Sequence, residues 1–396
     1  MSLVGWDSIC QPKWSGGLGM RQIRDQNIAF LLKLGYKLVS DDEALWVRVL
    51  KSKYGVNGFL PTSIEKANCS FLWKSLSKVW SLLHDNLIWT VGDGNRIRCR
   101  KDQWIPNVGP LIKYLPALAN INTDCLLSDL VTGEGNWNLK FLQEWLPEEV
   151  IFQIMGIPPP HPTEGPDRLS WRHTSTRAFS VKSAYKMLKE DSWNSRDELW
   201  KTTVRRGLAN DASCSICGHA SENILHIIRD CTVAKEAKQA SLDSRSISSD
   251  YTVLPLKELT SKDWIYLNAV GAVSRTSGRA AAGGVIWDST GNWIMGYNRF
   301  IGNCSIFDAE LWGILDGLKL IQWRGHDNVI IHSDSLEVVK AIHENDSKKP
   351  TSALLRRIHQ ILSQERQWII RHIPREENKS VDYLAKIALG RGGFFT

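Results

Sequence analysis

The chain has 396 residues, a formal net charge of +7, 43% hydrophobic residues and 23% charged residues. This length allows two or three domains that each bury a core, and the composition excludes a disordered polypeptide. The first residues lack the pattern of a secretory signal, and no apolar run approaches the roughly 20 residues of a membrane helix, so we expect a soluble protein of the nucleus or cytoplasm.

The first region, residues 1–157, mixes helix and turn signals. Apolar residues at helical spacing predict a helix over residues 27–40. The stretch from Gly92 to Asn95 predicts a hairpin-type turn ahead of a short strand over residues 96–99. Its glycines could also suggest phosphate binding, but no Gly-Lys-Ser/Thr follows, so we prefer the turn.

Tryptophan is unusually frequent, with 18 residues in the chain, most of them in its first half. Exposed rings could stack on nucleic-acid bases. Basic residues do not interleave consistently with the tryptophans, however, so we expect most of the rings to pack in a core. The net charge of +7 favours a polyanionic partner only weakly, because it could equally belong to an ordinary solvated surface.

Two polar stretches divide the rest of the chain. The proline-rich residues 158–166 can form neither a helix interior nor a central strand, so we expect a linker there. A helix is expected to begin within residues 180–185. Residues 241–250 form the second polar stretch, which precedes the final region.

Between these stretches lies a cysteine cluster with the spacing C-x2-C-x8-H-x4-C, made of Cys214, Cys217, His226 and Cys231. Three thiolates and one imidazole can complete a tetrahedral shell around Zn²⁺. His219 is a rival fourth ligand, and the pattern could also be a cysteine pair beside an incidental histidine. The remaining cysteines are scattered, which in a reducing compartment favours a metal site over a disulfide framework.

The final region, from about residue 263 to 396, has the clearest patterning. Three antiparallel strands followed by alternating helices and strands predict a mixed sheet with helices on its faces. The expected strands are 264–273, 281–287, 292–300, 329–331 and 368–370, and the expected helices are 308–323, 336–343, 352–364 and 379–389.

Three carboxylates of this region fall at strand ends or helix starts, where the ligand sites of α/β sheets gather. Glu310 lies early in the first long helix, Asp334 just after a buried strand, and Asp382 early in the last helix, behind Asn378 as a candidate N-cap. Converging carboxylates repel one another unless divalent cations neutralise them. Each acid alone could serve a helix terminus or the solvated surface, and only their joint placement favours a site.

The sequence around these acids resembles ribonuclease H domains, most closely the variant carried by plant non-LTR retroelements and the host genes derived from them. The likeness lies in Asp308-Ala-Glu310-Leu-Trp, in His332-Ser-Asp334-Ser, and in the stretch that begins at His372. It implies the ribonuclease H-like fold, which is a mixed five-stranded sheet with flanking helices. It also implies cleavage of the RNA strand of RNA–DNA hybrids with two Mg²⁺ or Mn²⁺ ions.

By this likeness, Glu310, Asp334 and Asp382 would hold the ions, and His372 would assist water attack or product release. The family has a fourth acid, an Asp in the first strand within a pattern like Asn-x-Asp-Gly. Here Val270 stands at the Asp position. Because the family's first Asp contacts both ions and valine has no ligand atom, we expect weakened metal binding and impaired cleavage.

The cysteine cluster and its surroundings resemble the zinc-binding reverse-transcriptase region that precedes ribonuclease H in the same elements. Trp200-Lys201 runs almost directly into Arg205-Arg206-Gly207, so we expect this region to be trimmed. Residues 1–157 resemble the segment that follows a polymerase domain, and the polymerase itself is expected to be absent. The expected domains are thus residues 1–157, a zinc-binding region at 158–240, a linker at 241–262, and the ribonuclease H-like domain at 263–396.

Two functions remain open. The chain is either an endoribonuclease that acts on RNA–DNA hybrids, or a catalytically inactive nucleic-acid-binding module or non-functional retroelement remnant. Val270 favours an inactive protein today. The three acids and His372 favour descent from an active endoribonuclease.

Overall fold

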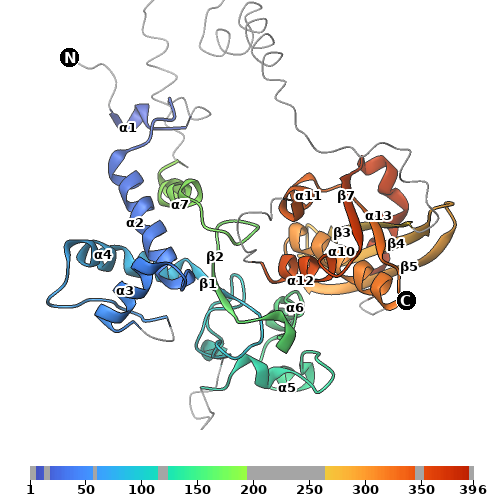
Figure 1. The fold of residues 1–396 in the computed structure, drawn as a ribbon, viewed down its shortest axis with the longest axis horizontal. Coiled ribbons are helices and arrows are strands. Elements are labelled where there is room, and N and C mark those ends of the chain that lie inside the picture. The colour runs from blue at the N-terminus through green and yellow to red at the C-terminus, as the bar shows by residue number, and fades with distance from the viewer. Residues whose placement is uncertain are drawn as a thin grey trace, which may run out of the picture. The chain divides into compact units, whose positions relative to one another are not determined.

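The computed structural model describes residues 6–12, 18–56, 60–114, 124–193, 264–343 and 352–391 (Figure 1). The chain divides into two compact units, of which one comprises residues 24–187 and 259–396 and the other residues 1–23 and 188–258. The expected zinc ligands, Cys214 to Cys231, lie outside the described residues. No helix within the described ranges is long and apolar enough to cross a membrane.

A five-stranded mixed sheet forms the C-terminal part of the larger unit. Its strands follow the order β5-β4-β3-β6-β7, with β3, β4 and β5 antiparallel and with β6 and β7 parallel to β3. The strands are β3 (Trp264–Val273), β4 (Arg279–Asp288), β5 (Trp293–Asn303), β6 (Asn328–Ser333) and β7 (Gln367–His372). The predicted mixed sheet is confirmed, and β5, β6 and β7 extend past their predicted ends.

Helices cover both faces of this sheet (Figure 1). The helices are α10 (Ile306–Trp323), α11 (Leu336–His343), α12 (Ala353–Leu362) and α13 (Lys379–Arg391). Side chains alternate along β3, so that Leu267 and Ala269 share a core with α10, α11 and α12, whereas Val270 and Ala272 pack against α13. The predicted flanking helices are therefore confirmed.

Glycine allows α10 to lie directly on β3. A Cβ atom at Gly271 would come within 2.4 Å of the Glu310 backbone nitrogen, and one at Gly313 would come within 3.0 Å of the Val270 carbonyl oxygen. No side chain fits in these gaps. The helix backbone can therefore touch the strand, and Glu310 lies against Gly271, near the carboxyl end of the middle strand β3.

Residues 24–187 are mainly helical, as expected. They contain α2 (Ile23–Ser40), α3 (Leu45–Tyr54), α4 (Phe71–Asp85), α5 (Leu139–Gln143), α6 (Glu148–Met155) and the start of α7 (Val181–Trp193), beside the antiparallel pair β1 (Leu87–Thr90) and β2 (Arg168–Trp171). The helices predicted at 27–40 and at 180–185 are confirmed by α2 and α7. The strand predicted over residues 96–99 is wrong. Only Arg98 pairs there, in an isolated bridge with Leu126, and the true strand precedes the turn as β1.

The tryptophans of this region belong to its core, as expected. Trp73, Trp104 and Trp171 are at most 2% exposed. Each indole N–H also donates a hydrogen bond: Trp73 to the Ile64 carbonyl at 2.8 Å, Trp104 to the Cys99 carbonyl at 2.9 Å, and Trp171 to the Ser183 hydroxyl at 3.0 Å. The rings thus fill the interior and satisfy polar groups at the same time.

The proline-rich residues 158–166, expected to be a linker, pack against α12 instead. Arg356 donates to the carbonyls of Val91 at 2.6 Å and Pro166 at 3.2 Å, and Arg357 donates to the Pro159 carbonyl. Proline cannot offer N–H groups, but its carbonyls remain free to accept. This segment therefore joins residues 24–187 to the C-terminal sheet through guanidinium groups.

Candidate functional site

Glu310 is the most buried of the three expected acids. It is 5% exposed, and its Oε2 has no hydrogen-bond partner among the described residues. Burial raises its pKa from 4.5 to about 8, with a further rise from the nearby Asp334 carboxylate and a smaller one from Asp382. The Gly271 amide and Arg375 oppose this shift. All three acids therefore share one electrostatic environment.

Asp334 directly follows β6 and is tied to β3 through Asn378. The Asn378 side-chain amide donates to the Ala269 carbonyl at 3.1 Å and to Asp334 Oδ1 at 3.4 Å. Asn378 is 1% exposed and ends the short 3₁₀ helix η8 (Arg375–Asn378), so it acts as a buried bridge in addition to preceding α13. The sequence suggested only the N-cap role.

Asp382 lies in the first turn of α13, where two cations accompany it. Lys386, one helical turn later, contacts Asp382 Oδ2, and Arg375 lies 3.9 Å from Asp382 Oδ1. Sequence reasoning missed both partners, although the i,i+4 spacing of Asp382 and Lys386 was a usable signal. Positive side chains of the protein itself thus compensate this carboxylate.

Val270, at the position of the missing acid, is 2% exposed and packs in an apolar cluster with Val285 of β4 and with Val381 and Ala385 of α13. Val381 immediately precedes Asp382. The aliphatic side chain therefore packs between β3, β4 and α13.

His372 ends β7 and is exposed, paired in register with Ser333, the residue before Asp334. The structure therefore brings the expected site residues to one end of the sheet. Among the described residues, no three Asp, Glu, His or Cys side chains stand close enough together to hold a metal ion.

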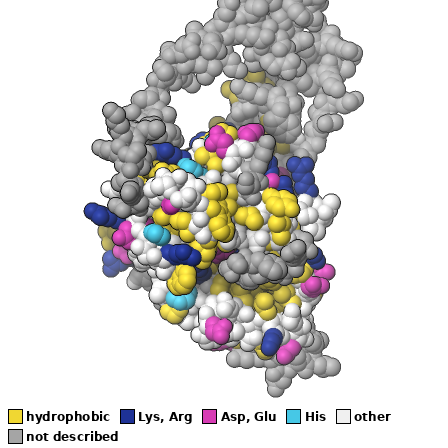
Figure 2. Space-filling view, turned by 90° about the vertical axis from the view of Figure 1, so that its right-hand side faces the viewer, with side chains coloured by type: hydrophobic (Ala, Val, Ile, Leu, Met, Phe, Trp, Pro, Cys, Tyr) yellow, Lys and Arg dark blue, Asp and Glu magenta, His cyan; other side chains and the backbone are white. Residues whose placement is uncertain are grey.

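The described residues on the face shown in Figure 2 form no single basic stripe. On the face shown in Figure 2, Lys and Arg side chains are interspersed with Asp and Glu, and hydrophobic side chains lie between them. The net charge of +7 is therefore not gathered in one patch on this face.

Comparison with known proteins identifies the C-terminal region. The family model described as "Reverse transcriptase-like" matches residues 268–388, which include all four expected catalytic residues. An Arabidopsis thaliana protein with the provisional name ribonuclease H protein is 26% identical across 98% of this chain and 80% of its own length. An uncharacterized mitochondrial protein of the same plant is 30% identical across 28% of this chain and 73% of its own length.

Solved structures similar to the chain include the RNase H1 of the halophilic archaeon Halobacterium salinarum, which is 26% identical. The match covers 32% of this chain and 98% of the archaeal chain, with a TM-score of 0.30. LC11-RNase H1, solved in complex with an RNA/DNA hybrid, matches with the same identity, coverage and TM-score.

Proposed function

We propose that the chain is a retroelement-derived protein of the ribonuclease H type, that it binds RNA–DNA hybrids or related nucleic acid, and that its hybrid cleavage is impaired. The observation that carries this proposal is Val270, a buried aliphatic side chain at the position where the family resemblance places the first Asp. The raised pKa of Glu310 supports a shared acidic site, because Asp334 and Asp382 both contribute to it.

The family resemblance implies Mg²⁺ or Mn²⁺ at Glu310, Asp334 and Asp382, and the donor set does not fit a two-ion site. Val270 has no oxygen where both ions need a shared ligand. Asp382 is compensated by Lys386 and Arg375. These features favour nucleic-acid binding without turnover.

His372 is proposed as an accessory residue of the same ancestral site. It is exposed at the strand end beside Ser333, where an imidazole can reach a bound strand. A histidine cannot replace a bridging carboxylate, so it does not compensate for Val270.

A non-functional remnant is the second candidate, and one observation favours it. The alignment with the Arabidopsis ribonuclease H-named protein runs over 507 residues, although this chain has only 396. More than a hundred residues of the relative thus have no counterpart here. We propose that part of this shortening falls in residues 158–240, where Cys214, Cys217, His226 and Cys231 are proposed Zn²⁺ ligands. The domain boundaries at 157, 240 and 262 are likewise proposals.

Cleavage of a labelled RNA–DNA hybrid in Mg²⁺ or Mn²⁺ tests the impaired site. We expect the natural chain to cleave at background level and Val270→Asp to increase the rate at least tenfold, since the change restores an oxygen donor. Val270→Asn is the matched control, because it adds polarity of similar size without a carboxylate. Val270→Asp combined with Asp334→Asn should return to background.

Robust cleavage by the natural chain would contradict the impaired site. Thermal melts of both Val270 variants show whether either is unfolded, and an Asp variant that folds but gains no activity would contradict the residue assignment. Hybrid binding is measured separately by fluorescence anisotropy at several salt concentrations. Absence of salt-dependent binding would favour the remnant, and zinc analysis of the full chain tests the cysteine cluster.

A further inference from the structure

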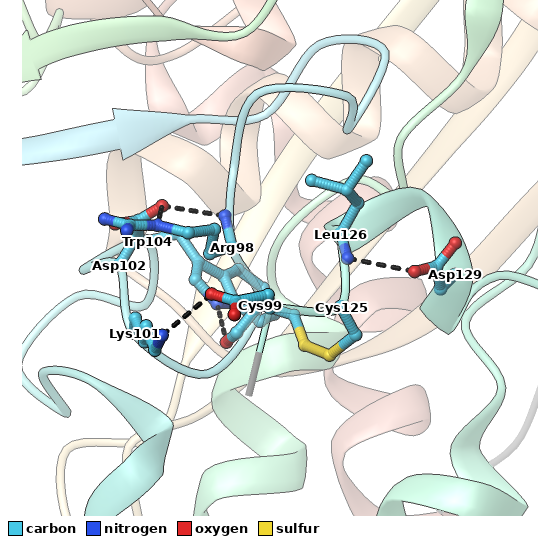
Figure 3. Close-up of a disulfide and its surroundings, with 9 residues drawn as sticks. Arg98, Cys99, Lys101, Asp102, Trp104, Cys125, Leu126 and Asp129 are labelled. Carbon is cyan, nitrogen blue, oxygen red and sulfur yellow. Dashed lines mark hydrogen bonds and ion pairs between the residues drawn. A yellow bond between two sulfur atoms is a disulfide. The ribbon is translucent and has the colours of Figure 1, made fainter. Parts of the chain in front are cut away.

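Cys99 and Cys125 form a disulfide, in contrast to the expectation that the chain has no disulfide framework (Figure 3). Their Cα atoms are 6.0 Å apart, a usual disulfide separation, and 26 residues separate them along the chain. We propose that this pair is a reversible redox site and that Cys125 is the sulfur that exchanges with low-molecular-weight thiols such as glutathione.

The two chain segments are aligned by backbone contacts that do not depend on the crosslink. The Cys99 N–H donates to the Cys125 carbonyl at 3.0 Å, and the Leu127 N–H donates to the Ile97 carbonyl at 2.9 Å. The Trp104 indole also holds the Cys99 carbonyl. Breaking the sulfur–sulfur bond therefore leaves both sulfurs facing each other, so that the bond can form again.

The two sulfurs differ in access. Cys99 is 0% exposed within a core cluster that includes Trp104 and Leu127, while Cys125 is half-buried at the surface, next to the exposed Asp124. Thiol–disulfide exchange requires a thiolate to reach one sulfur directly. From these exposures we expect an incoming thiol to react at Cys125 in preference to Cys99.

The exchange proceeds in two balanced steps. A glutathione thiolate attacks the Cys125 sulfur, a mixed disulfide forms there, and the Cys99 sulfur leaves with the electron pair and takes a proton from water. A second glutathione thiolate then attacks the glutathione sulfur of the mixed disulfide, which releases oxidised glutathione and the Cys125 thiolate. Two thiols are oxidised as the protein disulfide is reduced, and oxidised glutathione reverses the sequence.

Other cysteines offer a contrast. Among the described residues, Cys69 and Cys304 carry free thiols. Burial raises the pKa of Cys304 well above its usual range, which suppresses its thiolate. The crosslinked pair is thus distinguished by its paired geometry and by one accessible sulfur.

The crosslink also bears on a nearby cavity. Gln103, Trp104 and Asn107 lie inside the crosslinked loop and line a cavity of about 940 Å³ within the same unit. A bond that closes a 26-residue loop restricts the motion of that wall. Reduction is expected to lower the melting temperature of the full chain by about 5–10 °C.

Site-resolved alkylation and peptide mapping of the full chain test the proposal. Unreduced protein should show Cys99 and Cys125 protected, and both should become alkylated after reduction and unfolding. With oxidised glutathione as the probe, Cys99→Ser should be glutathionylated at Cys125. Cys125→Ser should be modified at Cys99 at least tenfold more slowly. Cys69→Ser is the matched control and should leave the protection of the pair unchanged.

Free thiols at both positions in the unreduced chain would overturn the proposal, as would equal modification of the two single variants. If a single variant fails to fold, the natural chain equilibrated with mixtures of reduced and oxidised glutathione gives the same information. A mixed disulfide trapped on Cys125 supports the proposal, and one trapped on Cys99 contradicts it.

Discussion

In the C-terminal region, five strands place most backbone polar groups in ladders, whereas residues 24–187 contain one short strand pair and satisfy their loop carbonyls with side-chain donors. The donors are indoles and guanidiniums: Trp73 reaches the Ile64 carbonyl and Arg356 reaches that of Val91. Buried carbonyls must find partners in either case. A region poor in sheet therefore depends on large side chains for order, and its stability should be concentrated in few residues.

The largest expected effect comes from Trp73, which is fully buried and stacks on Tyr54 at a ring distance of 4.0 Å. Trp73→Ala should lower the free energy of unfolding by about 3–5 kcal/mol, because it leaves a cavity and frees the Ile64 carbonyl. Chemical denaturation measures the change. Trp323→Ala, at a ring that is 77% exposed in the C-terminal region, should stay within about 0.5 kcal/mol. Equal losses of unfolding free energy in the two variants would contradict the idea that stability is concentrated in buried rings.

A smaller effect is expected at Arg356, whose guanidinium joins the two regions. Arg356→Met keeps the apolar stem but leaves the carbonyls of Val91 and Pro166 without their donor. We expect a loss of about 1–3 kcal/mol, measured by denaturation with probes in both regions. Arg324→Met, on an exposed residue, is the control. An unchanged midpoint for Arg356→Met would show that the two regions are not joined through this contact.

The third prediction concerns Glu310 in the C-terminal region, where the expected change in the free energy of unfolding for each pH unit is small. Its pKa is raised to about 8 on folding, so the folded state keeps a proton that the unfolded chain loses near pH 4.5. Stability must therefore fall as pH rises between these values, by at most about 1.4 kcal/mol per pH unit. Glu310→Gln should remove this dependence and be more stable than the natural chain at pH 8, in buffer with chelator.

Thermal melts from pH 5 to 9 measure this difference, with the exposed Glu377→Gln as a control. Parallel pH profiles for the natural chain and Glu310→Gln would show that this carboxyl ionises normally in the folded protein. The two regions would then differ in how they pack their side chains, and not in a carboxyl group whose pKa is raised by burial.

Local patterns predicted the C-terminal region well. The bounds of β3 and α11 coincide with the predicted ones, because side-chain alternation and helical spacing are local properties. The approximate places of Glu310, Asp334 and Asp382 followed from the same elements. In residues 24–187, the turn near Gly92 was found, but its strand was placed on the wrong side.

What the sequence did not reveal depends on contacts between distant segments. The disulfide joins residues 26 positions apart, and Asn378 bridges Ala269 and Asp334. No periodicity encodes which loop meets which strand. The packing of the proline-rich segment on α12 escaped for the same reason, since proline spacing reports local conformation and not partners.

The bridge made by Asn378 has an evolutionary consequence. It holds Ala269 and Asp334 together without help from any ion, so the framework around position 270 does not decay when metal is no longer bound. A change of the middle base turns any valine codon into a codon for aspartate or glutamate. A single point mutation in a gene copy would therefore return a carboxylate to a framework that Asn378 still holds.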